Sequence, residues 1–260
     1  MTDVPPTPSE GPRGNEREIA QLKAHSVEMG HWALGMIHDG WVAFQRSDLK
    51  LAQTVLDRDT RLAKYEEDIE HETIAFLLLR RPAGGDLRVA VGILKATTYL
   101  DRMGRLGFDI ARITTPEVKP DLPELRDHLQ NMDILAESQV ALVLDALEHD
   151  KVDLARSLFD RDDEIDRMHR ETNRIAVRQL LFDPLSGQHT SNEILIARHF
   201  ERIADNACRV AEKVIYGLTG QRPSEYLPRH PYLPYVLERP PAKGNDEAGA
   251  TPSPAPKDSK

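Results

Sequence analysis

The feature that most restricts how this chain can fold is an internal repeat. Asp57-Arg58-Asp59 reappears 103 residues later as Asp160-Arg161-Asp162, and Asp101-Arg102 reappears 100 residues later as Glu201-Arg202. Self-similarity over a long, nearly constant spacing indicates that one structural unit has been duplicated. The chain is therefore expected to contain two copies of the same unit.

Apolar residues recur every three to four positions through both copies, which is the pattern of amphipathic helices. The expected helices cover about 15–44, 48–80, 86–113, 125–148, 152–182 and 191–218. Asp48 and Asp86 are the expected N-caps of the second and third helices. Aromatic residues make up only 5% and charged residues 30% of the chain, which favours long helices over a β-sandwich or barrel.

These patterns predict an all-α fold of two tandem three-helix bundles, because long helices joined by short loops pack as antiparallel neighbours. The first bundle is expected at 15–115 and the second at 121–220. Proline-rich tails at 1–14 and 221–260 have little apolar content, and we expect them to be disordered.

Composition excludes several classes of protein. The net charge of -9 opposes nucleic-acid binding through a basic surface, and so opposes a transcription factor. No run of about 18 apolar residues suits a membrane span, and no secretion signal begins the chain. A single cysteine, Cys208, excludes an internal disulfide and fits a reducing compartment. We expect a cytoplasmic protein.

Two pairs of carboxylates lie four residues apart, one on each of the last two expected helices. Glu201 and Asp205 form one pair, and Asp162 and Asp166 form the other. Residues at this spacing share a helix face, so antiparallel packing could turn both pairs toward one groove. Four carboxylates repel each other, and an all-oxygen site suits hard cations such as magnesium, calcium, manganese or iron.

A solvated helix face is the alternative reading of these acidic pairs. Four arginines are near enough in sequence to neutralise them: Arg161, Arg167, Arg202 and Arg209. The spacing alone leaves both readings open.

Phe200-Glu201-Arg202-Ile203-Ala204-Asp205 and Leu100-Asp101-Arg102-Met103-Gly104 stand at corresponding places in the two copies. The first is similar to the Leu-Glu-Arg-Ile-Gly-Asp motif of the PhoU family of phosphate-transport regulators, and the second is similar to that motif's first-half counterpart. The chain therefore resembles this family. Asp86-Leu87-Arg88 stands at the family's spacing before Asp101. The likeness covers roughly 16–220.

The resemblance implies a function as well as a fold. It implies a non-enzymatic, cytoplasmic adaptor that connects the ATPase subunit of a phosphate ABC transporter to a sensor histidine kinase of a two-component system. Such a protein negatively regulates the phosphate-starvation response, forms a homodimer, binds no nucleic acid, and meets the membrane only through its partners.

The resemblance also implies metal binding at the acidic pairs. Carried over by position, Asp162, Asp166, Glu201 and Asp205 are the expected ligands of a divalent or trivalent ion: iron, manganese, magnesium or zinc. The identity of the ion is not given by the sequence.

The first half departs from this pattern. Asp59 and Asp101 stand at the leading positions, but the places four residues on hold Ala63 and Arg105. Asp109, one turn further, is a candidate for completing a weaker site. We hypothesise that Arg105 replaces the ion by pairing with Asp101 and Asp59; the alternative is that Arg105 is a surface residue.

Three other side chains have groups that can ligate a metal: Cys208, His199 and His169. Cys208 is expected to be a small buried hydrophobe rather than a ligand, and His199 lies away from the acidic pair on a helical wheel. A carboxylate-bridged di-iron protein of the ferritin kind is the alternative function, but it needs Glu-x-x-His pairs. Asp166-x-x-His169 is the nearest form in the second copy and has no partner on the last helix.

Overall fold

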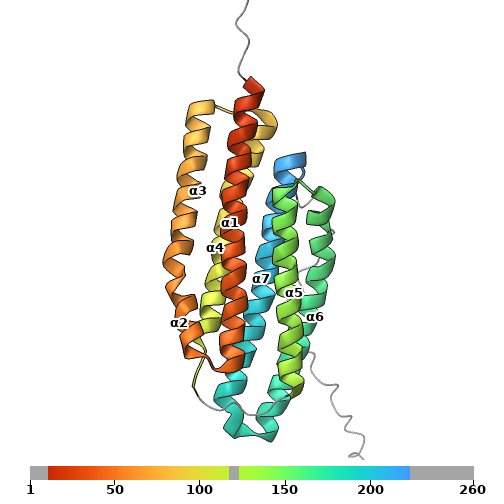
Figure 1. Ribbon diagram of the computed structural model, residues 1–260. Helices are drawn as coiled ribbons and strands as arrows, with labels where there is room; N and C mark the ends of the chain where they lie inside the picture. Colours follow the sequence, from red (N-terminus) through yellow and green to blue (C-terminus); the bar gives the residue numbers. More distant parts are fainter. Residues whose placement is uncertain (1–10, 117–122, 223–260) are drawn as a thin grey trace, which may run out of the picture. The chain divides into compact units, whose positions relative to one another are not determined.

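The computed structural model describes residues 11–116 and 123–222, and in these residues the chain forms α-helices, one short 3-10 helix and no strand (Figure 1). The elements are α1 (Gly11–Arg46), α2 (Leu49–Asp57), α3 (Asp59–Arg80), α4 (Gly84–Arg112), α5 (Pro123–Glu148), α6 (Val152–Phe182), η1 (Pro184–Ser186) and α7 (Gly187–Thr219). The predicted all-α fold is confirmed. None of the described helices is both long enough and apolar enough to cross a membrane.

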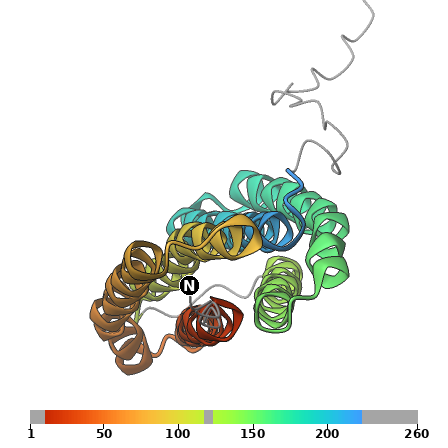
Figure 2. The same cartoon turned by 90° about the horizontal axis from the view of Figure 1, so that it is seen from above.

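The two helix sets pack against each other along their length. Viewed down the helices, α4 and α7 lie side by side in the middle, with α3 beyond α4 and α6 beyond α7 (Figure 2). Helix α1 covers α3 and α4, helix α5 covers α6 and α7, and α1 also contacts α5. The helices that carry the two copies of the repeated motif are therefore neighbours.

One hydrophobic core runs through both copies. Leu100 and Met103 of α4 and Phe200 and Ile203 of α7 are fully buried in it. Leu100 corresponds to Phe200 in the repeat, and Met103 corresponds to Ile203. Helices α4 and α7 therefore bury the same face of the repeated motif. Full burial of a large apolar side chain contributes about 1.5–3 kcal/mol, which makes the α4–α7 region a main source of stability.

The backbones of α1 and α4 touch where two glycines face each other. A Cβ atom on Gly107 would lie 2.6 Å from the backbone nitrogen of Ile37, and one on Gly40 would lie 2.6 Å from the carbonyl oxygen of Gly107. No larger residue fits this crossing without moving a helix. The contact fixes the register of α1 against α4.

The second expected helix is interrupted at Arg58, so the prediction of one helix over 48–80 is wrong there. The Arg58 N–H donates to the Val55 carbonyl at 3.1 Å, and the Arg58 guanidinium donates to Asp39 of α1 at 2.6 Å. Trp32 of α1 also donates its indole N–H to the Arg58 carbonyl at 3.3 Å. The break is thus held by contacts with α1, which local periodicity cannot reveal.

The predicted caps divide into one that is confirmed and one that is wrong. Asp48 caps α2, because its carboxylate accepts hydrogen bonds from the backbone N–H groups of Lys50 and Leu51 at 3.0 Å. Asp86 is not an N-cap: α4 begins two residues earlier, at Gly84. The Asp86 carboxylate instead accepts a hydrogen bond from the Asn15 amide at 3.0 Å, which ties α4 to α1.

Helix boundaries also differ at two other ends. Helix α1 begins at Gly11 rather than near residue 15, and α7 begins at Gly187 rather than near residue 191. The rest of the expected tails, 1–10 and 223–260, lies outside the described residues.

Candidate functional site

The four predicted ligands of the second copy come from two antiparallel neighbours and act on each other electrostatically. Asp162 and Asp166 lie on α6, and Glu201 and Asp205 lie on α7. We call these four residues the second-half cluster. Burial, followed by the charges of Asp205 and Asp166, raises the pKa of Asp162 to about 7. Burial, then the charges of Asp205 and Asp166, likewise raise the pKa of Glu201 to about 7.

The second-half cluster has little internal compensation for its charge. Oδ1 of Asp162 is buried without a hydrogen-bond partner. Within the described part of the chain, the ion pair that reaches this cluster joins Arg170 to Asp166, with a long N–O distance of 3.9 Å. Arg209, one of the arginines expected to neutralise the acids, pairs with Glu212 at 2.7 Å. The charges of Arg209 and Arg202 still lower the pKa of Asp205, so the alternative of an arginine-neutralised helix face keeps part of its support.

The chemistry of this cluster fits a hard cation. Four carboxylates supply only oxygen donors, and a partnerless buried oxygen is the kind of atom that a cation would satisfy. Yet in the described residues no three His, Cys, Asp or Glu side chains are arranged so that they could hold an ion. Binding would therefore require the four side chains to close in from α6 and α7.

Cys208 of α7 and His169 of α6 have side chains that can ligate a metal, and both lie near the second-half cluster. Cys208 is 6% exposed and belongs to the hydrophobic core, as predicted. Burial and the nearby carboxylates of Asp162 and Asp205 raise the pKa of its thiol, so it stays protonated and is a poor metal ligand. Burial lowers the pKa of His169, whose Nε2 lies 3.1 Å from the Asn173 amide nitrogen.

His199 is largely buried and lies among charged groups of α4 and of its own helix. Burial lowers its pKa, and the charged groups that act on it include Asp109 and Arg112 of α4. Asp109 itself pairs with Arg112 at 2.9 Å. Asp109 is therefore engaged with Arg112 on the side of α4 that faces His199.

In the first copy, an arginine holds the two leading carboxylates. Arg105 Nε donates to Asp101 Oδ2 at 2.8 Å, and Arg105 Nη1 donates to Asp59 Oδ1 at 3.2 Å. The structure thus shows both contacts of the hypothesis that Arg105 pairs with Asp101 and Asp59. Asp59 is on α3 and Asp101 on α4, so one guanidinium bridges two helices.

Glu66 is a member of this group that sequence reasoning missed. Its pKa is raised by burial and by the charge of Asp101, while Arg105 lowers it. Glu66 follows Asp59 by seven residues, or about two helical turns, which places both on one face of α3. The seven-residue spacing could therefore have identified Glu66 from the sequence. We call Asp59, Glu66, Asp101 and Arg105 the first-half cluster.

A second unexpected carboxylate lies where α5 packs against α1. Asp133 is 4% exposed, and its Oδ1 has no hydrogen-bond partner. Burial, followed by the charge of Glu137 and a hydrogen bond with it, raises the pKa of Asp133 to about 8. Gln130 donates to the other Asp133 oxygen at 3.3 Å, and Glu137 pairs with His38 of α1 at 2.9 Å.

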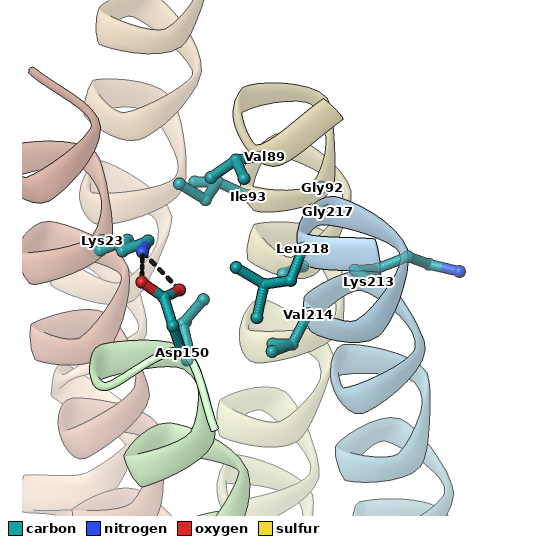
Figure 3. A pocket seen from close by; sticks show the side chains of 11 residues that line it. Lys23, Val89, Gly92, Ile93, Asp150, Lys213, Val214, Gly217 and Leu218 are labelled. Atoms are coloured by element: carbon teal, nitrogen blue, oxygen red, sulfur yellow. Dashed lines mark hydrogen bonds and ion pairs between the residues drawn. The ribbon is translucent and has the colours of Figure 1, made fainter. Parts of the chain in front are cut away.

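A small cavity lies where α1, α4, α7 and the α5–α6 turn meet (Figure 3). Its volume is about 20 Å³, which suits a water molecule rather than a metabolite. Val89, Ile93 and Leu218 give it an apolar lining, and the ion pair between Lys23 and Asp150 lies beside it (Figure 3). This cavity is not a substrate pocket.

Comparison with known proteins finds one known domain in both copies of the repeat. The PhoU domain matches residues 27–114 and 129–214, once in each predicted copy. A phosphate-specific transport system accessory protein PhoU homolog of Rhizobium meliloti is 31% identical over 215 residues, covering 82% of this chain and 91% of that protein. PhoU homolog 1 of Thermotoga maritima is 30% identical over 220 residues, covering 82% and 92%.

Solved structures agree with the fold. The crystal structure of PhoU from Pseudomonas aeruginosa superposes with a TM-score of 0.75 at 29% identity, covering 79% of this chain and 99% of that one. The phosphate transport system regulatory protein PhoU of Streptococcus pneumoniae superposes with a TM-score of 0.74 at 24% identity, covering 80% and 98%.

Proposed function

The chain belongs to the PhoU family, and from this we propose that it is a cytoplasmic regulator of phosphate uptake and of phosphate-starvation signalling. In this role it connects the ATPase subunit of a phosphate ABC transporter to a sensor histidine kinase and restrains the starvation response when phosphate is plentiful. The observation that carries the proposal is the match of the PhoU domain to both copies of the repeat. The relatives named above are accessory proteins of phosphate-specific transport.

The small cavity and the exposed apolar side chains of the protein support a non-enzymatic role. The cavity described above is too small for a metabolite. Large apolar side chains are instead exposed where α6 ends and in the turn that follows: Leu181, Phe182 and Leu185. Exposed apolar residues near one another are a common feature of protein-binding surfaces. These properties support an adaptor that works through contacts with other proteins and pairs with a second copy of itself.

A bound cation belongs to this proposal. Asp162, Asp166, Glu201 and Asp205 would hold it, and the ion would neutralise carboxylates that burial and mutual repulsion disfavour when charged. By drawing α6 and α7 together, it would stiffen the surface that these two helices present. Iron, manganese, magnesium and zinc all accept carboxylate oxygen donors.

The decisive experiment joins binding and regulation. The tagged chain is produced with the ATPase subunit of the phosphate transporter from its own host, and the two are tested for co-purification. In parallel, a starvation-responsive reporter is measured in the host after deletion of the gene. We expect co-purification, and a reporter that stays active at high phosphate until the gene is restored. A reporter that remains repressed in the deletion strain, together with no co-purification, would refute the proposed function.

A further inference from the structure

We propose that Arg105 is the built-in counter-ion of the first-half cluster, so that this half is closed to metal ions and the protein has one cation site instead of two. The proposal concerns this chain's own departure from the repeated acidic pattern. It stands on the contacts of Arg105 and is independent of which partners the protein regulates.

The position of Arg105 is that of a bridging cation. Its guanidinium contacts Asp101 on α4 and Asp59 on α3, at 2.8 Å and 3.2 Å. An arginine can do this because its planar fork has several N–H donors in fixed directions. Asp101 is only 7% exposed, so the negative charge that Arg105 neutralises lies almost wholly inside the protein.

Charge in the first-half cluster keeps Arg105 in place. Hydrogen bonding to Asp101, and then the charges of Asp101, Asp59 and Glu66, raise the pKa of the guanidinium, so it stays positively charged. A metal ion that approached Asp101 would meet this fixed positive charge. It would also have to displace two charge-assisted hydrogen bonds.

The carboxylates that could form an acidic site are nevertheless still present around Arg105. Oδ1 of Asp101 is buried and has no hydrogen-bond partner, although Oδ2 is bound to Arg105. If Arg105 were removed, Asp59, Glu66 and Asp101 would be three neighbouring carboxylates, with Arg102 left to act on Glu66 alone among the charges that lower its pKa. Removal should therefore both destabilise the protein and create a place for a cation.

The corresponding positions of the second copy show the opposite arrangement. Asp162 and Glu201 correspond to Asp59 and Asp101, but Asp205 stands where the first copy has Arg105. Among the described residues, no arginine or lysine forms an ion pair with Asp162, Glu201 or Asp205. One copy thus carries its own cation, and the other has carboxylates left to bind one.

The test measures metal binding to the first half alone. Glu201→Gln and Asp205→Asn are combined to remove two of the acids of the second-half cluster, and Arg105→Leu or Arg105→Lys is added to this background. Mn²⁺ bound per chain is counted by electron paramagnetic resonance, and melting temperature is followed with and without Mn²⁺. Arg112→Leu is the matched control, because Arg112 is an exposed arginine on the same helix that pairs with Asp109.

With Arg105 present, we expect no bound Mn²⁺ in this background and no change in melting temperature when Mn²⁺ is added. Arg105→Leu should lower the melting temperature by about 3–10 °C, because it leaves a buried carboxylate unpaired. Mn²⁺ should then bind and restore at least half of the loss. Arg105→Lys should be intermediate, since an ammonium lacks the fork that reaches both carboxylates, and Arg112→Leu should change the melting temperature by less than about 2 °C.

Three results would overturn the proposal. Mn²⁺ bound in the background that retains Arg105 would show that the first half is open to metal, and this result does not depend on the folding of any Arg105 variant. An unchanged melting temperature for Arg105→Leu would show that this exposed arginine does not stabilise the buried carboxylate of Asp101. A lowered melting temperature that Mn²⁺ does not restore would make Arg105 an ordinary ion-pair partner rather than a replacement for a cation.

Discussion

Replacing Asp133 by asparagine should stabilise the protein above neutral pH and have a smaller effect in acid. Asp133 lies between α5 and α1, almost wholly buried, beside the carboxylate of Glu137. Its pKa rises from 3.8 in the unfolded chain to about 8 in the fold, first because of burial and then because of Glu137. The folded protein therefore binds this proton more tightly than the unfolded chain does.

The sign and size of the effect follow from this difference in proton binding. Between the two pKa values, the unfolded chain has lost the proton and the fold has kept it, so stability falls as pH rises. The loss is about 1.4 kcal/mol per pH unit, or about 3 kcal/mol between about pH 5 and pH 7. Above the folded pKa of about 8 the loss levels off. Asparagine keeps a donor toward Glu137 and an acceptor for Gln130, but it has no proton to lose.

The assay is urea unfolding of the parent and of Asp133→Asn at several pH values, followed by circular dichroism. The variant's advantage in unfolding free energy should widen by about 1.4 kcal/mol per pH unit and reach a plateau near pH 8. Asp127→Asn, an exposed aspartate on the same helix, is the control and should give a profile parallel to the parent's. Parallel profiles for parent and Asp133→Asn would refute the reasoning, because they would mean that burial does not keep Asp133 protonated.

The remaining predictions concern packing, capping and metal binding. Gly107→Ala should lower the free energy of unfolding by at least about 2 kcal/mol in urea titrations, because its Cβ would meet the α1 backbone. Gly35→Ala should be neutral or gain up to about 1 kcal/mol, because its Cβ would make only an ordinary contact with Arg58 Nη1, at 3.9 Å. Similar losses for both variants would contradict the clash. Asp48→Ala should cost about 1 kcal/mol through loss of the α2 cap, and no measurable change would show that the cap contributes nothing to stability. Mn²⁺ at about one hundred times its dissociation constant should stabilise the parent by about 2.7 kcal/mol in the same titrations, and the combined change Glu201→Gln and Asp205→Asn should remove that gain; stabilisation that persists in the double variant would place the ion elsewhere.

Local sequence pattern was sufficient for the helices but not for their interruptions. The three-to-four period identified each long amphipathic stretch, because burial of one face determines where apolar residues stand. The break at Arg58 depends on Trp32 and Asp39 of another helix, so nothing in the local pattern marks it. Asp86 was misassigned for a similar reason: its partner is Asn15 on α1 rather than the start of its own helix.

The four-residue spacing predicted some of the acidic residues of the candidate sites and missed others. The pairs in the second copy, and the link from Arg105 to Asp101, follow from the i, i+4 rule. Glu66 falls outside the i, i+4 rule because it lies seven residues after Asp59, a spacing of about two turns that also returns to the same helix face. Asp133 could have been found as well, because it stands among the apolar positions Leu129, Met132 and Ala136 of the buried stripe of α5.

The hydrophobic core shared by the two copies makes each copy part of the other's interior. A lone helix triplet would leave the face of α4 that now packs on α7 open to water, and an equivalent triplet covers it. Because both triplets lie in one chain, they need not be identical. One copy can therefore carry an arginine, Arg105, at the position where the other carries an acid, Asp205.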